Sequence, residues 1–256
     1  MRNVNSVLRR ASEEVYDRSV DYVPATLAGV GLKTIYFVIL TIIGGGIGIF
    51  LINNFPASFV YMAISSFIIG FITAIIAMRS VRLAFPLGSI YCIVEGMFLG
   101  VVSLYLEQYA PGIVITAILS TIAIVLACGV VFITGLVKVN NKFRRFLALF
   151  AISFLITGLF ISILMIFGVI ASDNYLLIIG VGFVTLLLAC LFLINDFSYA
   201  YELVRNNEPK ELEWMVAFGI AYTVIWLYYE VLRLLYLIFG RRNSENNCYE
   251  KDYLGY

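Results

Sequence analysis

Histidine is missing from this 256-residue chain, and its absence excludes three classes of site at once. A Ser-His-Asp triad, an HExxH zinc site and an imidazole pH switch all need the ring that the chain lacks. The four cysteines show neither CxxC nor metal-ligand spacing, so we expect no disulfide framework. There is no Walker motif and no Rossmann fingerprint, and Gly180-Val181-Gly182-Phe183 lacks the aspartate of an intramembrane GxGD protease. We therefore expect no enzyme and no cofactor.

Charge is also scarce, and most of it lies near the two ends of the chain. Charged residues make up 13% of the sequence, whereas a soluble protein carries about 25%. They number 8 in residues 1–31, 10 in residues 32–195 and 15 in residues 196–256. Ten charges in so long a central stretch cannot form a solvated surface, so a lipid bilayer must be its solvent. The net charge of +1 gives no indication of a nucleic-acid partner.

The chain is rich instead in long apolar runs. Apolar residues make up 62% of it, and the mean hydropathy is +0.99. A helix needs about 20 apolar residues to cross a bilayer, whereas the strands of a membrane barrel alternate over about ten. We therefore predict an all-α membrane protein. Its seven transmembrane helices are expected at about 32–52, 58–78, 84–106, 111–135, 146–170, 175–195 and 213–239.

Two polar segments flank this single transmembrane domain, residues 32–239. Residues 1–31 interleave arginines with acids and lack the apolar core of a signal peptide, so we expect a cytoplasmic amphipathic arm. Residues 240–256 form a polar tail. Basic residues follow the second and fourth runs but not the third and fifth, which places the N-terminus in the cytoplasm. We expect a multi-pass protein of the cell membrane.

The seventh run leaves two alternatives open. Its uninterrupted apolar part, Met215–Tyr229, is short, and Glu230 and Arg233 follow it. A full span would put Arg241 and Arg242 outside the cell, against the charge rule, whereas a segment that dips in and returns would keep them inside. A central helix sheathed by others tolerates charges, which favours the full span.

A few charges lie inside the runs, where lipid makes each cost about 2.5–3.5 kcal/mol. Glu95 is near the middle of the third run, beside Gly96 and Gly100, whose GxxxG spacing allows another helix to approach closely. Glu230 and Arg233 are three residues apart and share one helix face. The structural alternatives are a protonated packing residue for Glu95 and a self-neutralising pair for Glu230 and Arg233.

Two further charged residues lie at the ends of apolar runs, and a cluster of glycines lies inside the first run. Asp196 ends the sixth run and Arg79 the second, where the alternatives are a solvated helix-end carboxylate and a snorkelling anchor. Gly44-Gly45-Gly46 with Gly48 indicates close packing of the first helix. A tight calcium site needs six to eight oxygens, which the sequence does not obviously supply, but a weak, transient cation site is compatible with these acids.

Several stretches follow one another in the order known from one protein family. They are SIYCIVEGMFLG at 89–100, YAPGIV at 109–114, TGLVKV at 134–139, KFRR at 142–145, NDF at 195–197, EWMVAFG at 213–219 and WLYYEVLRLL at 226–235. Together with NSVLR at 5–9, they resemble the Bax inhibitor-1 (transmembrane Bax inhibitor motif) family, in its bacterial branch, over nearly the whole chain.

The resemblance implies seven helices with the last one central, and a pH-sensitive calcium leak gated by two acids. Asp196 matches the first acid and Glu230 the second, so both are expected to contact calcium weakly and transiently. Two carboxylates that share a proton titrate as a coupled pair, which would give a pH gate without histidine. Arg79 matches the arginine that closes the path by pairing with the first acid. Glu95 matches a glutamate common in the third helix, and with Arg233 it is a candidate for the pathway.

Glu230 departs from the family pattern, and a second function is also compatible with the sequence. Many members carry Asp where this chain has Glu230, whose longer side chain keeps the charge but changes its reach. Arg233, one turn along, competes for that acid. The alternative function is a non-transporting regulator that binds a membrane protease or a stress-response partner, because the charged arm and tail accompany no catalytic set. The expected partners are therefore the bilayer, calcium or protons, and in the second case a membrane protein.

Overall fold

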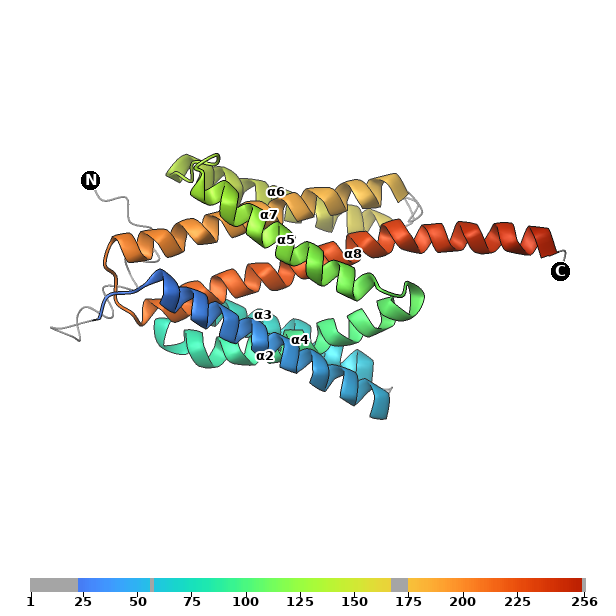
Figure 1. Cartoon of the computed structure of the whole chain (residues 1–256), viewed down its shortest axis with the longest axis horizontal. Helices are drawn as coiled ribbons and strands as arrows, with labels where there is room; N and C mark the ends of the chain where they lie inside the picture. Colours follow the sequence, from blue (N-terminus) through green and yellow to red (C-terminus); the bar gives the residue numbers. More distant parts are fainter. Residues whose placement is uncertain (1–22, 56–57, 167–174, 255–256) are drawn as a thin grey trace. The chain divides into compact units, whose positions relative to one another are not determined.

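The computed structural model describes residues 23–55, 58–166 and 175–254, and this part of the chain is helical. The only strand-like feature within these ranges is an isolated bridge between Pro24 and Pro209. The prediction of an all-α protein is thus confirmed. The helices of the described residues (Figure 1) are α2 Leu27–Asn54, α3 Ser58–Ala77, α4 Val81–Tyr109, α5 Ile113–Ile133, α6 Asn141–Ile166, α7 Tyr175–Arg205 and α8 Leu212–Leu254.

Six of these helices are long and apolar enough to cross a membrane. The other described helix, α3, contains a shorter apolar stretch, Ile68–Ala77. Many large apolar side chains are exposed along the spans, among them Ile42, Phe71 and Leu155. A water-soluble protein does not expose so much contiguous apolar surface, whereas lipid solvates it. The chain is therefore a multi-pass membrane protein.

Some sequence predictions fall outside the described residues. Residues 1–22 of the expected N-terminal arm do so, as do residues 167–170 at the end of the fifth expected helix. The side chains of the polar tail, from Gly240 onwards, are likewise outside, although the backbone of α8 continues helically to Leu254.

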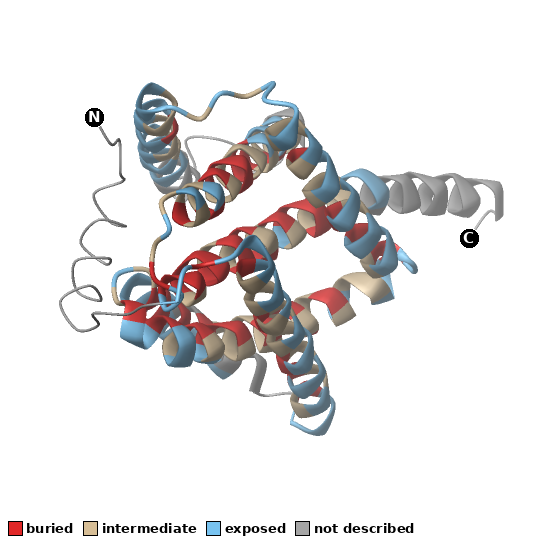
Figure 2. Cartoon of the chain, turned by 60° about the vertical axis from the view of Figure 1, so that its left-hand side comes forward, coloured by how far each residue is buried: buried red, intermediate tan, exposed pale blue. Residues whose placement is uncertain are grey.

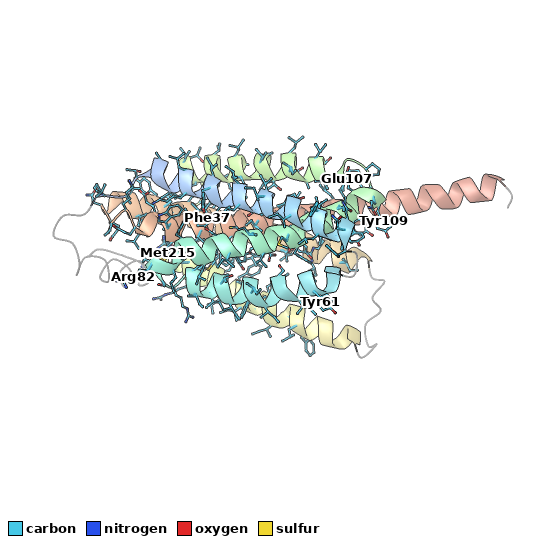
Figure 3. All side chains as sticks on the ribbon, turned by 90° about the horizontal axis from the view of Figure 1, so that it is seen from below. Phe37, Tyr61, Arg82, Glu107, Tyr109 and Met215 are labelled. Atoms are coloured by element: carbon cyan, nitrogen blue, oxygen red, sulfur yellow. The ribbon has the colours of Figure 1, made fainter. Side chains whose placement is uncertain are left out.

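The chain divides into two compact units. The first contains residues 1–114 and 196–225, and the second contains residues 115–195 and 226–256. Both α7 and α8 contribute residues to each unit. In the first unit α4 packs against α2 and against α3 (Figure 1). Figure 3 shows Arg82 at one end of this unit and Tyr61, Glu107 and Tyr109 at the other.

Glycine makes the contact between α2 and α4 possible. Gly44 and Gly48 on α2 lie against the backbone of α4, and Gly96 and Gly100 on α4 lie against the backbone of α2. A Cβ atom at any of the four would overlap a carbonyl oxygen of the opposite helix. Close packing at both glycine clusters is therefore confirmed. Such small residues let helices in lipid approach closely enough for dispersion contacts to hold them together.

The last helix, α8, is one uninterrupted helix and the most buried of the six candidate spans (Figure 2). Buried residues make up 67% of its apolar window, against at most 44% in the other five. A segment that dips into the membrane and returns has to reverse its direction, which a continuous helix does not do. The structure therefore favours the full span, and the burial of α8 agrees with a central last helix.

The backbone before α2 is fixed to the backbone before α8. The Ala25 N–H donates to the Glu208 carbonyl at 2.8 Å, and the Lys210 N–H donates to the Val23 carbonyl at 2.9 Å. Thr26 then caps α2, because its hydroxyl oxygen accepts a hydrogen bond from the Gly29 N–H at 3.0 Å. The starts of the first and last described helices are therefore held side by side.

Candidate functional site

In the second unit, Glu230 of α8 is the centre of a buried polar network. Only 4% of the residue is exposed. Its carboxylate accepts hydrogen bonds from the Thr185 hydroxyl of α7 at 2.8 Å and from Trp226 Nε1 at 3.3 Å. Arg233 Nη2 lies 2.6 Å from the same carboxylate. The two residues therefore form an ion pair, as the alternative of a self-neutralising pair predicted, and competition of Arg233 for the gating role of Glu230 stays a prediction.

The network closes on itself through Thr185. Arg233 Nη2 donates to the Thr185 hydroxyl oxygen at 2.9 Å, while the hydroxyl donates to Glu230. The guanidinium and the hydroxyl therefore face the same carboxylate oxygen from two helices. A carboxylate buried in a lipid-spanning bundle needs such partners, because an unpaired charge there costs several kcal/mol. Arg233 Nε, which is also buried, has no acceptor among the described residues.

We predict that Thr185→Val destabilises the protein by about 1–3 kcal/mol, because it leaves Glu230 and Arg233 with one buried hydrogen bond fewer each. The valine matches threonine in shape, so packing is retained. Thermal unfolding in detergent measures the change. Thr121→Val is the matched control: its buried hydroxyl donates to the Ala117 carbonyl of its own helix at 2.7 Å, and its loss should cost at most about 1 kcal/mol. Equal destabilisation by both variants would contradict the network.

In the first unit, Asp196 of α7 is bound to α8 through Thr223. The Thr223 hydroxyl donates to Asp196 Oδ2 at 2.5 Å. Thr223 is buried and Asp196 is half-buried. The helix does not end at this acid, because α7 continues to Arg205. Asp196 is therefore a carboxylate within a helix, and the alternative of a helix-end carboxylate does not describe it.

The remaining predicted gate residue, Arg79, is exposed and lies between the end of α3 and the start of α4. Its pairing with Asp196 stays a prediction. Asp196 belongs to the first unit and Glu230 to the second, so their shared proton also stays a prediction. Within the described ranges, no three His, Cys, Asp or Glu side chains gather in a way that would hold a metal ion.

Glu95 lies in the middle of α4 and faces a cavity of about 410 Å³ in the first unit. The Ser66 hydroxyl of α3 donates to Glu95 Oε2 at 2.9 Å. The cavity lies beside α3 and α4 and also touches Tyr222 of α8. Glu95 therefore both contacts a neighbouring helix and lines a cavity, and its place on an ion pathway stays a prediction.

One charged cluster was not predicted as a site from the sequence. Glu213, in the first turn of α8, is completely buried. Its carboxylate accepts from the Thr26 N–H at 2.7 Å and pairs with Lys33 Nζ at 2.8 Å. The ammonium of Lys33 also lies over the Trp214 ring, 4.7 Å from its centroid. A signal was present, because Lys33 is the only charge in the first apolar run and Glu213 immediately precedes the last one.

A family model described as Bax inhibitor 1 like matches residues 5–240. No curated protein is similar enough to count as a match.

Proposed function

The chain belongs to the Bax inhibitor 1-like family, and we propose from this that it is a passive, pH-modulated calcium leak pathway. It acts in the cell membrane with its N-terminus in the cytoplasm. Asp196 and Glu230 are the acid pair that senses protons, and Arg79 is the residue that closes the path. The family match and the six apolar helices show that the chain is a multi-pass membrane protein of this family.

The observation that supports the proposal best is the position of the two acids at contacts between α7 and α8. Glu230 of α8 is held by Thr185 of α7, and Asp196 of α7 is held by Thr223 of α8. Carboxylates inside apolar helices are costly and usually mark ion or proton paths. Each of the two acids is thus a polar group within an apolar helix and is bound to a hydroxyl on the neighbouring helix.

The charges of Asp196 and Arg79 explain how the proposed gate opens and closes. While Asp196 is ionised, it attracts Arg79 and the path is closed. Protonation removes the negative charge of Asp196, so the attraction is lost and the path opens as the pH falls. Each acid offers at most two oxygens to calcium, and a tight site needs six to eight. Calcium is therefore held weakly at each step, which suits passage rather than storage.

The test is calcium release from vesicles that contain the purified protein. We expect faster release at acidic than at alkaline pH for the wild type. In Asp196→Asn and in Arg79→Ala the closing pair is absent, so release at alkaline pH rises to the acidic rate and the ratio of the two rates falls to unity. Glu230→Gln should also flatten the pH profile.

Glu211→Gln is the matched control for these variants, because Glu211 is an exposed acid just before α8. It should keep the wild-type pH profile. Release that is indifferent to pH and survives both Asp196→Asn and Glu230→Gln would overturn the proposal. Release no faster than from protein-free vesicles would overturn it in favour of the regulator that binds another membrane protein.

A further inference from the structure

We propose that the cavity beside Glu95 binds a lipophilic organic cation, a ligand distinct from calcium and from protons. Its volume of about 410 Å³ lies within the range of small-molecule sites, about 300–1,000 Å³. The lining is mostly apolar and aromatic, with Phe71, Tyr91, Phe98 and Tyr222 around the single carboxylate of Glu95. This composition is typical of a site in which apolar surface gives affinity and one polar group gives specificity.

The charge of the cavity calls for a cation. Among the described residues that line it, Glu95 is the only acidic residue and there is no basic one. Its hydrogen bond from Ser66 is neutral, and the ion pairs of the described residues leave the Glu95 carboxylate without a cation. Aromatic faces attract cations by about 0.5–2 kcal/mol each. A positively charged ligand therefore gains from the rings and from the carboxylate together.

The donor set excludes an inorganic divalent ion as the ligand. Glu95 provides two carboxylate oxygens, and Ser66, Tyr91 and Tyr222 provide at most one hydroxyl each, whereas calcium takes six to eight oxygens. The rest of the described lining is carbon from residues such as Ala63, Ala74 and Ile75, together with the thioether of Met78. A cation whose charge is spread over carbon substituents fits this lining, because it needs few oxygen ligands and is itself apolar.

The position of Glu95 in the middle of α4 further restricts which ligands can reach it. Glu95 is fourteen residues from either end of α4, which runs from Val81 to Tyr109. At 1.5 Å per residue this is about 21 Å of helix in each direction. Lipid head groups lie near the ends of such a span, so an amine on a lipid head group does not reach the carboxylate. The ligand therefore has to enter the hydrocarbon region as a whole.

Part of the lining of the cavity is accessible from outside. Two of its lining residues on α3 are accessible from outside, with Phe71 exposed by 63% and Ile75 by 39%. The space behind them exists because the neighbouring positions are small. A Cβ at Gly70 would lie 3.3 Å from Glu95 Oε2, so even alanine there would crowd the carboxylate. A lipophilic cation dissolved in the bilayer thus has a lateral route to Glu95.

The test uses tetraphenylphosphonium and tetraphenylborate, which share one shape and carry opposite charges. Binding is measured on the full chain in lipid nanodiscs, with protein-free nanodiscs subtracted. We expect saturable binding of tetraphenylphosphonium and none of tetraphenylborate. Glu95→Gln should weaken cation binding at least tenfold, and Glu95→Asp should retain most of it. Ala74→Leu, which fills the cavity but keeps the charge, should abolish it.

Glu107→Gln is the matched control, because Glu107 is the other acid of α4 and does not line the cavity. Its cation affinity should equal that of the wild type. Size-exclusion profiles and thermal unfolding show that each variant is folded. Equal affinity of wild type and Glu95→Gln for tetraphenylphosphonium would overturn the proposal, as would saturable binding of tetraphenylborate. Neither outcome depends on calcium flux, so this site and the leak stand or fall separately.

Discussion

Glu213→Gln is expected to lower the free energy of unfolding by about 3–5 kcal/mol, the cost of removing one partner from a buried ion pair. The carboxylate is completely buried, and Lys33 Nζ lies 2.8 Å from it. Without its partner, the Lys33 ammonium stays partly buried and uncompensated. The Thr26 N–H also loses a charged acceptor. Thermal or denaturant unfolding in a mild detergent measures the change.

Two further variants separate the ion pair from general damage. Glu211→Gln removes an exposed acid two residues earlier and should change stability by about 0.5 kcal/mol or less. The double variant Lys33→Met, Glu213→Met removes both charges, so it should lose less than the sum of the single changes. If Glu213→Gln is no more harmful than Glu211→Gln, the ion pair does not stabilise the start of α8.

The second large effect is expected at the glycines between α2 and α4. Gly48→Ala and Gly96→Ala each place a methyl group against a carbonyl oxygen of the opposite helix. The helices must separate, and overpacking of this kind costs about 1–3 kcal/mol per site. The same unfolding measurement detects the loss, and the double variant should be less harmful than the sum because the first change already separates the helices.

Gly46 is the matched control for this contact. It lies on α2 between Gly44 and Gly48, but a Cβ built there meets no atom within 4 Å. Gly46→Ala should therefore leave stability unchanged or raise it slightly, since alanine is the better helix former by about 1 kcal/mol. Destabilisation by Gly46→Ala equal to that by Gly48→Ala would show that the close approach of α2 and α4 is not the cause.

The fold followed from the sequence because membrane helices obey a local rule. A bilayer requires about 20 apolar residues per span, and that length is visible in the sequence without knowledge of any contact. The glycine contacts and the Glu230–Arg233 pair were predictable for the same reason, since each depends on spacing within one helix. The end of α7 was less visible, because the helix continues past Asp196 into a more polar segment that contains no proline.

The parts of the candidate sites that were not predicted depend on residues far apart in the sequence. Lys33 and Glu213 are 180 positions apart, and neither spacing nor composition relates them. The cavity at Glu95 depends on small residues of α3, such as Gly70 and Ala74, that leave room opposite a carboxylate of α4. An empty volume is a property of three-dimensional packing, so a one-dimensional pattern does not report it.

The pairing of the start of α2 with the start of α8 has a consequence for biosynthesis. Lys33 belongs to α2 and leaves the ribosome before α3 to α8 have been made, whereas Glu213 follows only after α2 to α7. During membrane insertion the Lys33 ammonium therefore has to extend to the aqueous boundary, as long basic side chains do. When α8 inserts, Glu213 takes the place of water as the partner of Lys33. It also accepts the hydrogen bond from Thr26, 187 positions earlier in the chain. A chain that stops before Glu213 therefore lacks the group that neutralises Lys33 of α2.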